Sequence, residues 1–355
     1  MCLAARRIPS AMFSSSDLTN DLKTLLLEMS HEKGKLTVPK ERFKERSQMM
    51  EKKIFDFVRL ASAALALVLG ITNMDCPAEA TERPLRIICF GAHPDDCEIK
   101  AGGVGAMWAA QGHKVKFVST TNGDIGHFKM AGGPLAQRRT KEVQEAAKIL
   151  GIETEVLDIH DGEIMPTLEN RRTIVRLIRD WKADIVMAHR PNDYHPDHRY
   201  TSILVQDAGY MVTVPFFCPD VPHLSRNPVF MYYSDRFEKP NPFEPDIVVG
   251  IDSVMEQKLD ALSKIVSQFV EGGCGGNESQ IPKNDAEMQD AVKRVRRNFG
   301  NRFASTADKY RVELIELYGE EKGKQIKCAE AFEVCEYGRR PSFAELKQLF
   351  PFFGQ

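Results

Sequence analysis

The sequence predicts an α/β protein with a Rossmann-like, doubly wound, mostly parallel sheet, helices on both faces and a helical C-terminal extension. Two observations lead to this prediction. Short apolar, β-branched runs alternate with helical patterns from residue 85 to residue 269, and this alternation is typical of βαβ units. In 184–188, every residue after Asp184 is apolar, as expected for a central parallel strand that is buried on both faces.

The helices are recognised by apolar residues that recur every three or four positions. In 135–150, Val143, Ala146 and Leu150 have this spacing, and Gly151 is a suitable C-terminal stop. The same patterns place the other elements along the chain. We expect strands at 85–90, 114–120, 153–159, 184–188, 229–233 and 246–251. We expect helices that begin near 104 and 199, and others at 168–181, 253–269, 284–304 and 308–318.

The N-terminal region has the layout of a leader. Residues 1–49 are polar and lack a steady period, Lys52 and Lys53 then precede an uncharged run at 61–71, and Ala78–Ala80 has the small-x-small pattern of a cleavage site. This order is typical of a secretory signal peptide. The apolar run is shorter than the roughly 18 residues that a spanning helix needs. We therefore expect an exported protein, periplasmic or extracellular, with no integral membrane span after cleavage near Ala80.

Two alternatives to a signal peptide stay open, which are a buried core helix at 54–71 and an N-terminal membrane anchor.

The domain organisation follows from the patterns along the chain. The predicted parts are a leader at 1–80 with its signal-like segment at 50–80, a Rossmann-like domain at 81–275, and a helical extension at 276–355 that packs on the same domain.

Composition excludes several classes of protein. The chain has 355 residues, of which 43% are hydrophobic and 28% charged, so it can bury a sizeable core. The formal net charge is −2 and no long basic run occurs, which argues against a nucleic-acid partner. The eight cysteines include no CxxC pair, which excludes a zinc ribbon and gives no sign of a disulfide framework.

Two polar segments follow predicted strands. His93, Asp95 and Asp96 come directly after the first strand, and the segment His195–His198 comes after the fourth. Neighbouring parallel strands at a switch point bring such loops together. Two histidines and one carboxylate can form a catalytic metal centre that leaves a position open. Capping of the next helix by one aspartate is the simpler alternative, but it leaves the second aspartate and the histidine unexplained.

These segments resemble the motifs of a known family. Ala92–Asp96 followed by Gly102 and Gly103 resembles the first motif of the PIG-L/LmbE-like de-N-acetylases, and His195–His198 resembles the second. Arg138 and Arg139, with Glu142, resemble the helix between these motifs. The match covers about residues 86–270. Members of this family hydrolyse the N-acetyl group of N-acetylglucosamine-like substrates with a water molecule activated by zinc.

The resemblance implies a role for each matching residue. It makes His93, Asp96 and His198 the metal ligands. It makes Asp95 the general base and His195 the group that stabilises or protonates the tetrahedral intermediate. The substrate contact implied by the match is Arg139. Cys97 and Lys100 depart from the family pattern, which leaves the shape of the pocket open.

Four further residues are candidates from their positions in loops. Asp124 and His127 lie on the glycine-rich loop after the second strand, where they either line the substrate cleft or are simply exposed. Asp197 either orients a ligand histidine from behind or caps the next helix. The same two alternatives apply to Asp193.

The resulting hypothesis is a zinc-dependent amide hydrolase acting on a small N-acylated sugar. Iron(II) is an alternative metal, because a mononuclear iron site uses the same two histidines and carboxylate. A catalytically silent sugar-binding module is the alternative function, and a homo-oligomer stays open. A dinucleotide-binding protein is disfavoured, because the first strand–helix turn lacks GxGxxG and has two aspartates that would repel a pyrophosphate.

We expect the mature protein to begin at or near Thr81, because the small-x-small pattern of Ala78–Ala80 directly precedes it. N-terminal sequencing of the exported protein tests this expectation. Residues 1–49 recovered on the exported, active form would contradict it.

Overall fold

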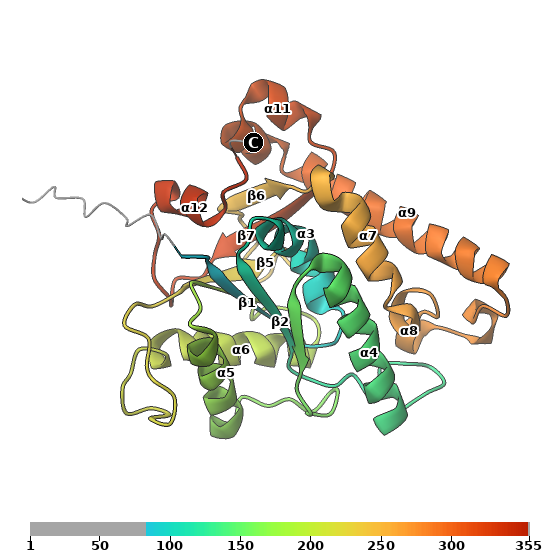
Figure 1. Cartoon of the computed structure of the whole chain (residues 1–355), viewed down its shortest axis with the longest axis horizontal. Coiled ribbons are helices and arrows are strands. Elements are labelled where there is room, and N and C mark those ends of the chain that lie inside the picture. The colour runs from blue at the N-terminus through green and yellow to red at the C-terminus, as the bar shows by residue number, and fades with distance from the viewer. Residues whose placement is uncertain (1–82, 354–355) are drawn as a thin grey trace, which may run out of the picture. The chain divides into compact units, whose positions relative to one another are not determined.

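The computed structural model describes residues 83–353 and contains a seven-stranded sheet (Figure 1). The strand order is β3-β2-β1-β4-β5-β7-β6. The first five strands in this order pair in parallel, and β7 runs antiparallel to both of its neighbours. The prediction of a mostly parallel α/β sheet is therefore confirmed. The strands are β1 (Arg86–Gly91), β2 (Lys114–Ser119), β3 (Glu153–Val156), β4 (Ile185–Ala188), β5 (Val229–Tyr233), β6 (Ile247–Gly250) and β7 (Ala329–Val334).

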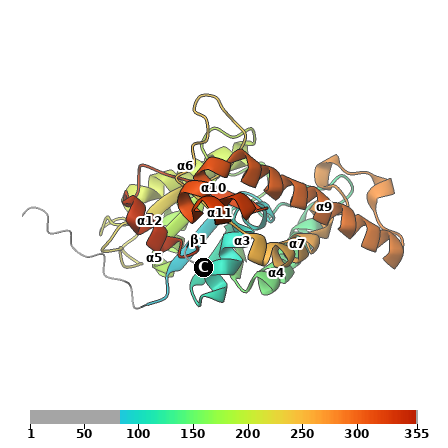
Figure 2. The ribbon, with the colours of Figure 1, turned by 90° about the horizontal axis from the view of Figure 1, so that it is seen from above.

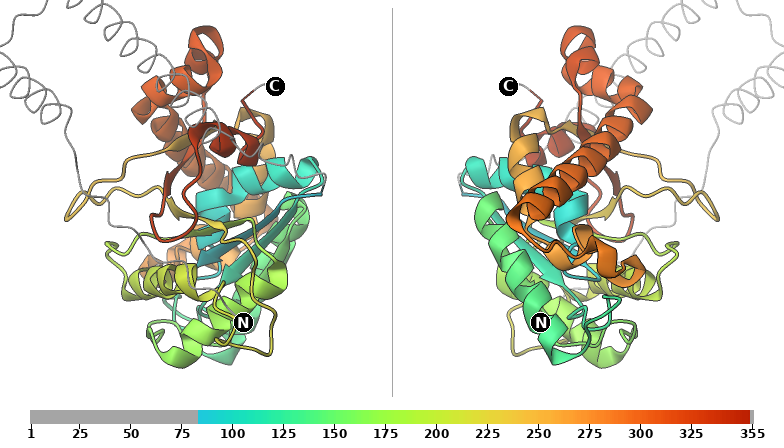
Figure 3. Two further views of the ribbon diagram at one scale, coloured as in Figure 1. Left: turned by 90° about the vertical axis from the view of Figure 1, so that its left-hand side faces the viewer. Right: turned by 90° about the vertical axis from the view of Figure 1, so that its right-hand side faces the viewer.

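Helices cover both faces of the sheet, and Figure 3 shows α3 on the opposite side from α5 and α6. The C-terminal region contains α9, α10, α11 and α12, and α9 packs against α7 (Figure 2). The helical C-terminal region is thus also confirmed. The α-helices are α3 (Asp96–Ala110), α4 (Gly133–Leu150), α5 (Leu168–Trp181), α6 (Pro196–Met211), α7 (Met255–Ser263), α8 (Val266–Phe269), α9 (Asp285–Lys309), α10 (Arg311–Tyr318), α11 (Glu320–Gln325) and α12 (Phe343–Leu349).

The two hydrophobic cores lie on the two faces of β1. Ile87 and Cys89 belong to the core under α3, α4 and α7, whereas Ile88 and Phe90 belong to the core under α5 and α6. Successive side chains of a strand point to opposite faces, so a strand with a run of apolar residues packs against helices on both faces of the sheet. This is why β1 is buried from Ile87 to its end.

Several elements differ from the sequence-based expectation. Helix α3 begins at Asp96, well before the expected start near 104, and α11 and α12 were not predicted. The helix expected at 253–269 is divided into a short 3₁₀ turn (Asp252–Val254), α7 and α8. Strand β7 was not predicted. It lies within the C-terminal extension and inserts between β5 and β6, although its sequence contains two glutamates.

The leader at 1–80 lies outside the described residues. The signal peptide, its cleavage site and the two alternatives for 54–71 therefore stay predictions, as do the domain boundaries. Among residues 83–353, no helix combines the length and the hydropathy that a membrane crossing requires.

A buried ion pair fixes α3 against β7. The Glu330 carboxylate accepts hydrogen bonds from the backbone amides of Gly103 and Val104, both at 2.8 Å. It also pairs with the ammonium group of Lys258, which donates to the Ile99 carbonyl oxygen at 2.8 Å. A buried charge is costly unless it is paired and hydrogen-bonded. The buried carboxylate therefore needs the two amide hydrogen bonds from α3, and these bonds form only if the backbone of α3 lies close to it.

We expect Gly103→Ala to lower the free energy of unfolding by about 1–3 kcal/mol, the usual effect of overpacking. A Cβ atom there would lie 2.8 Å from Ile251 Cγ2 and 2.9 Å from Glu330 Oε1. The matched control is Gly102→Ala, since a Cβ atom at Gly102 would meet nothing closer than 3.6 Å. The control should be neutral or up to about 1 kcal/mol more stable, because alanine favours a helix. Urea denaturation followed by circular dichroism measures both, and equal effects of the two substitutions would contradict this account.

Candidate active site

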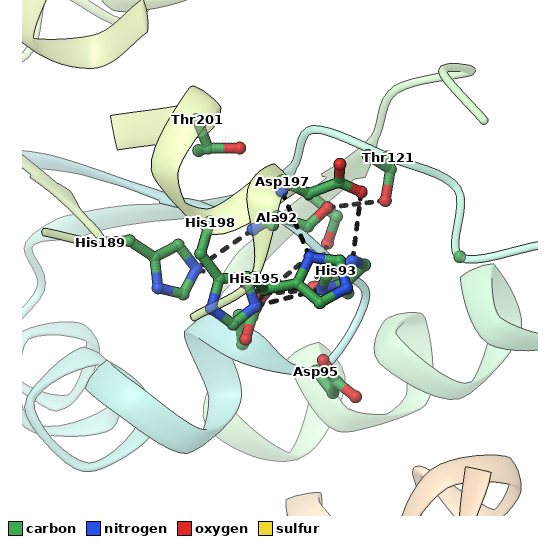
Figure 4. Close-up of polar contacts among 12 residues, drawn as sticks. Ala92, His93, Asp95, Thr121, His189, His195, Asp197, His198 and Thr201 are labelled. Atoms are coloured by element: carbon green, nitrogen blue, oxygen red, sulfur yellow. Dashed lines mark hydrogen bonds and ion pairs between the residues drawn. The ribbon is translucent and has the colours of Figure 1, made fainter. Parts of the chain in front are cut away.

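The polar residues gather where β1 and β4 end. These strands are neighbours and pair in parallel. Because β2 lies on one side of β1 and β4 on the other, the direction of winding reverses between β1 and β4, and ligands bind at such a switch point. The turn after β1 supplies His93 and Asp95, and the first residue of α3 is Asp96. The turn after β4 supplies His195, and the first turn of α6 supplies His198 (Figure 4).

Donor atoms of His93, Asp96 and His198 form a nearly equilateral triangle. His93 Nδ1 and Asp96 Oδ2 lie 3.4 Å apart, His198 Nε2 and Asp96 Oδ2 lie 3.4 Å apart, and the two ring nitrogens lie 3.3 Å apart. Three ligands of a tetrahedral zinc ion at bond lengths of 2.0–2.1 Å are about 3.3–3.4 Å from one another. The spacing of these donors therefore matches that of three ligands of a divalent metal ion.

Carboxylates face the other nitrogen of each ring. His93 Nε2 lies 3.0 Å from Asp161 Oδ1 and 3.4 Å from Asp197 Oδ2, and His198 Nδ1 lies 3.1 Å from Asp193 Oδ2. Such carboxylates fix the orientation and tautomer of a ligand histidine. They leave His93 Nδ1 and His198 Nε2 as the nitrogens that face the centre of the triangle.

The charges of the site shift its pKa values. Burial opposes the ionisation of Asp96, but the neighbouring imidazoles of His198 and His189 hold the pKa of this carboxyl group well below its usual range. Burial also opposes the charging of His93, yet the carboxylates of Asp161, Asp197 and Asp96 raise its pKa well above the ordinary value. The pKa of His198 is raised in the same way, against burial, by the charge of Asp96 and a hydrogen bond to Asp193.

Asp95 directly precedes Asp96 in the chain and is held by Arg139. Arg139 Nη2 donates to Asp95 Oδ2 at 3.2 Å, Nη1 donates to the Gly123 carbonyl oxygen at 3.1 Å, and the arginine side chain is only 2% exposed. Burial raises the pKa of Asp95, although the positive charge of Arg139 opposes this effect. Asp95 occupies the position before α3 but its side chain makes no capping hydrogen bond.

His195 is half-buried at the start of α6. Its Nδ1 accepts a hydrogen bond from the backbone amide of Asp197 at 3.2 Å, so its proton is on Nε2. The ring centre lies 4.7 Å from that of His93 and 5.1 Å from that of His198. Burial and the charges of these two histidines lower the pKa of His195. His195 is therefore a neutral N–H donor at the edge of the triangle.

Asp197 is not the cap of α6, because His195 fills that position. The Asp197 carboxylate is fully buried and accepts a hydrogen bond from the Gly162 amide at 2.7 Å. Asp193 likewise accepts a hydrogen bond from the backbone amide of His195, at 3.0 Å. Both carboxylates thus connect a histidine of the site to the surrounding loops, and their role in orienting a metal ligand stays a prediction.

Asp124 and His127 are both buried. Asp124 accepts from the backbone amide of Asp161 at 3.1 Å and pairs with His160 Nδ1 at 2.7 Å. His127 Nδ1 accepts two backbone amides of its own loop, and its Nε2 lies 3.1 Å from Glu271 Oε2. Simple exposure is therefore excluded, and both side chains organise the loop after β2. Their contact with substrate, like that of Arg139, stays a prediction.

Two residues of the site were missed in the sequence. Asp161 follows β3 and pairs with His93, and His189 directly follows β4 with its Nε2 at 3.3 Å from Asp96 Oδ2. Burial and the charge of His198 lower the pKa of His189 to about 4. With Asp96 and His198 it forms one of three further groups among the described residues that could hold a metal ion, the others being His93–His195–His198 and His93–Asp161–Asp197. The only signal in the sequence was the position of each residue after a strand.

Comparisons with known proteins agree with this geometry. The family model described as GlcNAc-PI de-N-acetylase (PIG-L) matches residues 88–209. The diacetylchitobiose deacetylase of Thermococcus kodakarensis is 35% identical over 198 residues, which cover 52% of this chain and 71% of that protein. The 4-oxalmesaconate hydratase of Pseudomonas putida is 26% identical over 207 residues, which cover 55% of this chain and 76% of that protein.

Solved structures share the fold. The N,N'-diacetylchitobiose deacetylase of Pyrococcus horikoshii superposes with a TM-score of 0.56 at 22% identity, covering 78% of this chain and 93% of that chain. The similarity predicted from the two motifs is thus confirmed. From the matched family model and the extent of the similarity to the Thermococcus protein, the chain belongs to the PIG-L (GlcNAc-PI de-N-acetylase) family.

Proposed function

We propose that this chain is a metal-dependent hydrolase that removes an N-acetyl group from an N-acetylglucosamine-like sugar or sugar conjugate. The observation that carries the proposal is the triangle of His93, Asp96 and His198 donors, with spacings of 3.3–3.4 Å, next to the carboxylate of Asp95. The 35% identity to a diacetylchitobiose deacetylase supports the same reaction.

The residues around the triangle divide the work of amide hydrolysis. A metal ion held by His93, Asp96 and His198 would polarise the amide carbonyl group and lower the pKa of water. Asp95 takes the proton of the attacking water, and Arg139 holds its carboxylate in place. His195 donates a hydrogen bond from Nε2 to the oxyanion of the tetrahedral intermediate, because its Nδ1 accepts one from the Asp197 amide. Asp95 then passes the proton that it took from water to the departing amine.

Zinc is the metal that we propose, because two imidazoles and one carboxylate with an open fourth position are typical of catalytic zinc. Iron(II) stays the alternative. The substrate is a small molecule and no nucleic acid is involved. Export and a homo-oligomeric state are part of the proposal as predictions from the sequence.

Two other functions compete with this one. One relative is named a hydratase, but its sequence is only 26% identical to this chain, whereas that of the deacetylase is 35% identical. A sugar-binding module without activity would need no base, whereas Asp95 is held next to the triangle by Arg139. Measuring acetate released from a panel of N-acetylated sugars tests the proposal. No release in the presence of zinc or iron(II) would overturn it.

We expect one metal ion per chain and its loss in His198→Ala, because this change removes one of three donors. His160→Ala is the matched control, since that exposed imidazole pairs with Asp124 outside the triangle. Elemental analysis after dialysis measures the metal, and thermal unfolding checks the fold. Protonated imidazoles cannot bind a metal, so occupancy should fall as the pH drops through the raised pKa values of His93 and His198. Full occupancy in His198→Ala would mean that the ligand set is wrong.

We expect Asp95→Asn and Asp96→Ala to fail for different reasons. Asp95→Asn keeps the size of the side chain but removes the base, so the metal should stay bound while kcat falls by about 10²–10⁴-fold, or about 3–5.5 kcal/mol of barrier. Asp96→Ala should lose the metal itself. Parallel measurements of kcat and metal content separate the two effects. If Asp95→Asn retains both metal and near-wild-type kcat, then His195 becomes the first candidate for the base.

A further inference from the structure

An exposed aromatic ring lies against the histidines of the site. Tyr194 is 69% exposed, and its ring centre lies 5.7 Å from that of His195 and 5.8 Å from that of His198. Both contacts are edge-to-face. Among the exposed large hydrophobic residues of the described part of the chain, Tyr194 alone has ring contacts with a residue of the metal triangle.

The position of this ring is fixed from behind. Arg199 Nη1 donates to the carbonyl oxygens of Asp193 and Tyr194, both at 2.9 Å. Phe237 lies 6.0 Å from the tyrosine ring, on the loop after β5. Single exposed aromatic residues are common and need no explanation, but this one has its backbone held and its ring supported beside a reaction centre.

Resting on the proposed function, we propose that Tyr194 is the platform on which the pyranose ring of the substrate stacks. The acetamido group must reach the triangle, and the pyranose ring is attached directly to its nitrogen. A substrate bound in this way has its sugar ring close to the triangle, where the exposed ring of Tyr194 contacts His198. Aromatic side chains with a few placed polar groups are typical of small-molecule sites, and the C–H face of a pyranose is apolar.

Tyr194 is therefore a specificity-determining residue, which selects N-acetylated pyranoses over amides without a ring. It touches the sugar and takes no part in proton transfer. Its removal should weaken the binding of the substrate and leave the chemical step unchanged, because the contact is the same in the ground state and the transition state.

Three variants of the full chain test this role. Tyr194→Ala removes the ring, and Tyr194→Phe keeps it. Tyr210→Ala is the matched control, because Tyr210 is equally exposed at 71% and lies near the other end of α6. The substrates are N,N'-diacetylchitobiose and an acyclic amide, N-acetylethanolamine.

For the sugar, Tyr194→Ala should raise KM by about 3- to 10-fold with kcat unchanged within about twofold. Tyr194→Phe and Tyr210→Ala should behave like the wild type. For the acyclic amide, Tyr194→Ala should have no effect. A similar loss on both substrates would overturn the proposal, because it would show that Tyr194 supports the structure of the site. An unchanged KM for the sugar would also overturn it.

A binding measurement separates this proposal from the proposed function. In saturation-transfer NMR, the ring protons of glucosamine should receive saturation from the wild type and from Tyr194→Phe, and much less from Tyr194→Ala. If the wild type releases no acetate, the proposed function fails, but this measurement still decides the platform. Equal saturation with Tyr194→Ala, or no binding of glucosamine to the wild type, would overturn the platform.

Discussion

The parallel pairing of β1 with β4 is the constraint on which the candidate site depends. Ile87 pairs with Ile185 and Cys89 with Met187, so the two strands end close together and their following loops start side by side. No single segment contains the whole triangle, since His93 and Asp96 follow β1 and His198 follows β4. Because a shift of one residue would turn every side chain of a strand to the opposite face, the two hydrophobic cores that fix this register also fix the distances between His93, Asp96 and His198.

The charge balance of the site favours a cation. Arg139 is the one cationic side chain that bonds to these acids among the described residues, and the histidines can be neutral. Without further positive charge, the carboxylates would repel one another in a buried place, which is costly. Protons on the histidines or a divalent ion can supply that charge, and the two compete for the same nitrogens. The carboxylates are Asp95, Asp96, Asp161, Asp193 and Asp197.

Features formed by one continuous segment could be predicted from the sequence, whereas features that depend on contacts between distant residues could not. The apolar runs of β1 and β4 and the two histidine–aspartate segments are continuous in the sequence, so they predicted the fold and the place of the site. Strand β7 was missed because Glu330 looks like a solvent-facing residue until Lys258 is placed beside it. Asp161 was missed for the same reason, because its partner His93 is far away in the sequence. Arg139 could be singled out, but only the structure reveals its bond to Asp95.

The position of β7 has a consequence for biosynthesis. Residues 329–334 fill the gap between β5 and β6, so the sheet cannot close until residue 334 has left the ribosome. Before that moment β5 and β6 expose unpaired backbone edges, and such edges promote association with other chains. The ammonium group of Lys258 also lacks its carboxylate partner until then. Since contacts between distant segments slow folding, these edges stay open until β7 is in place, and a chain truncated before residue 329 would keep the open edge permanently.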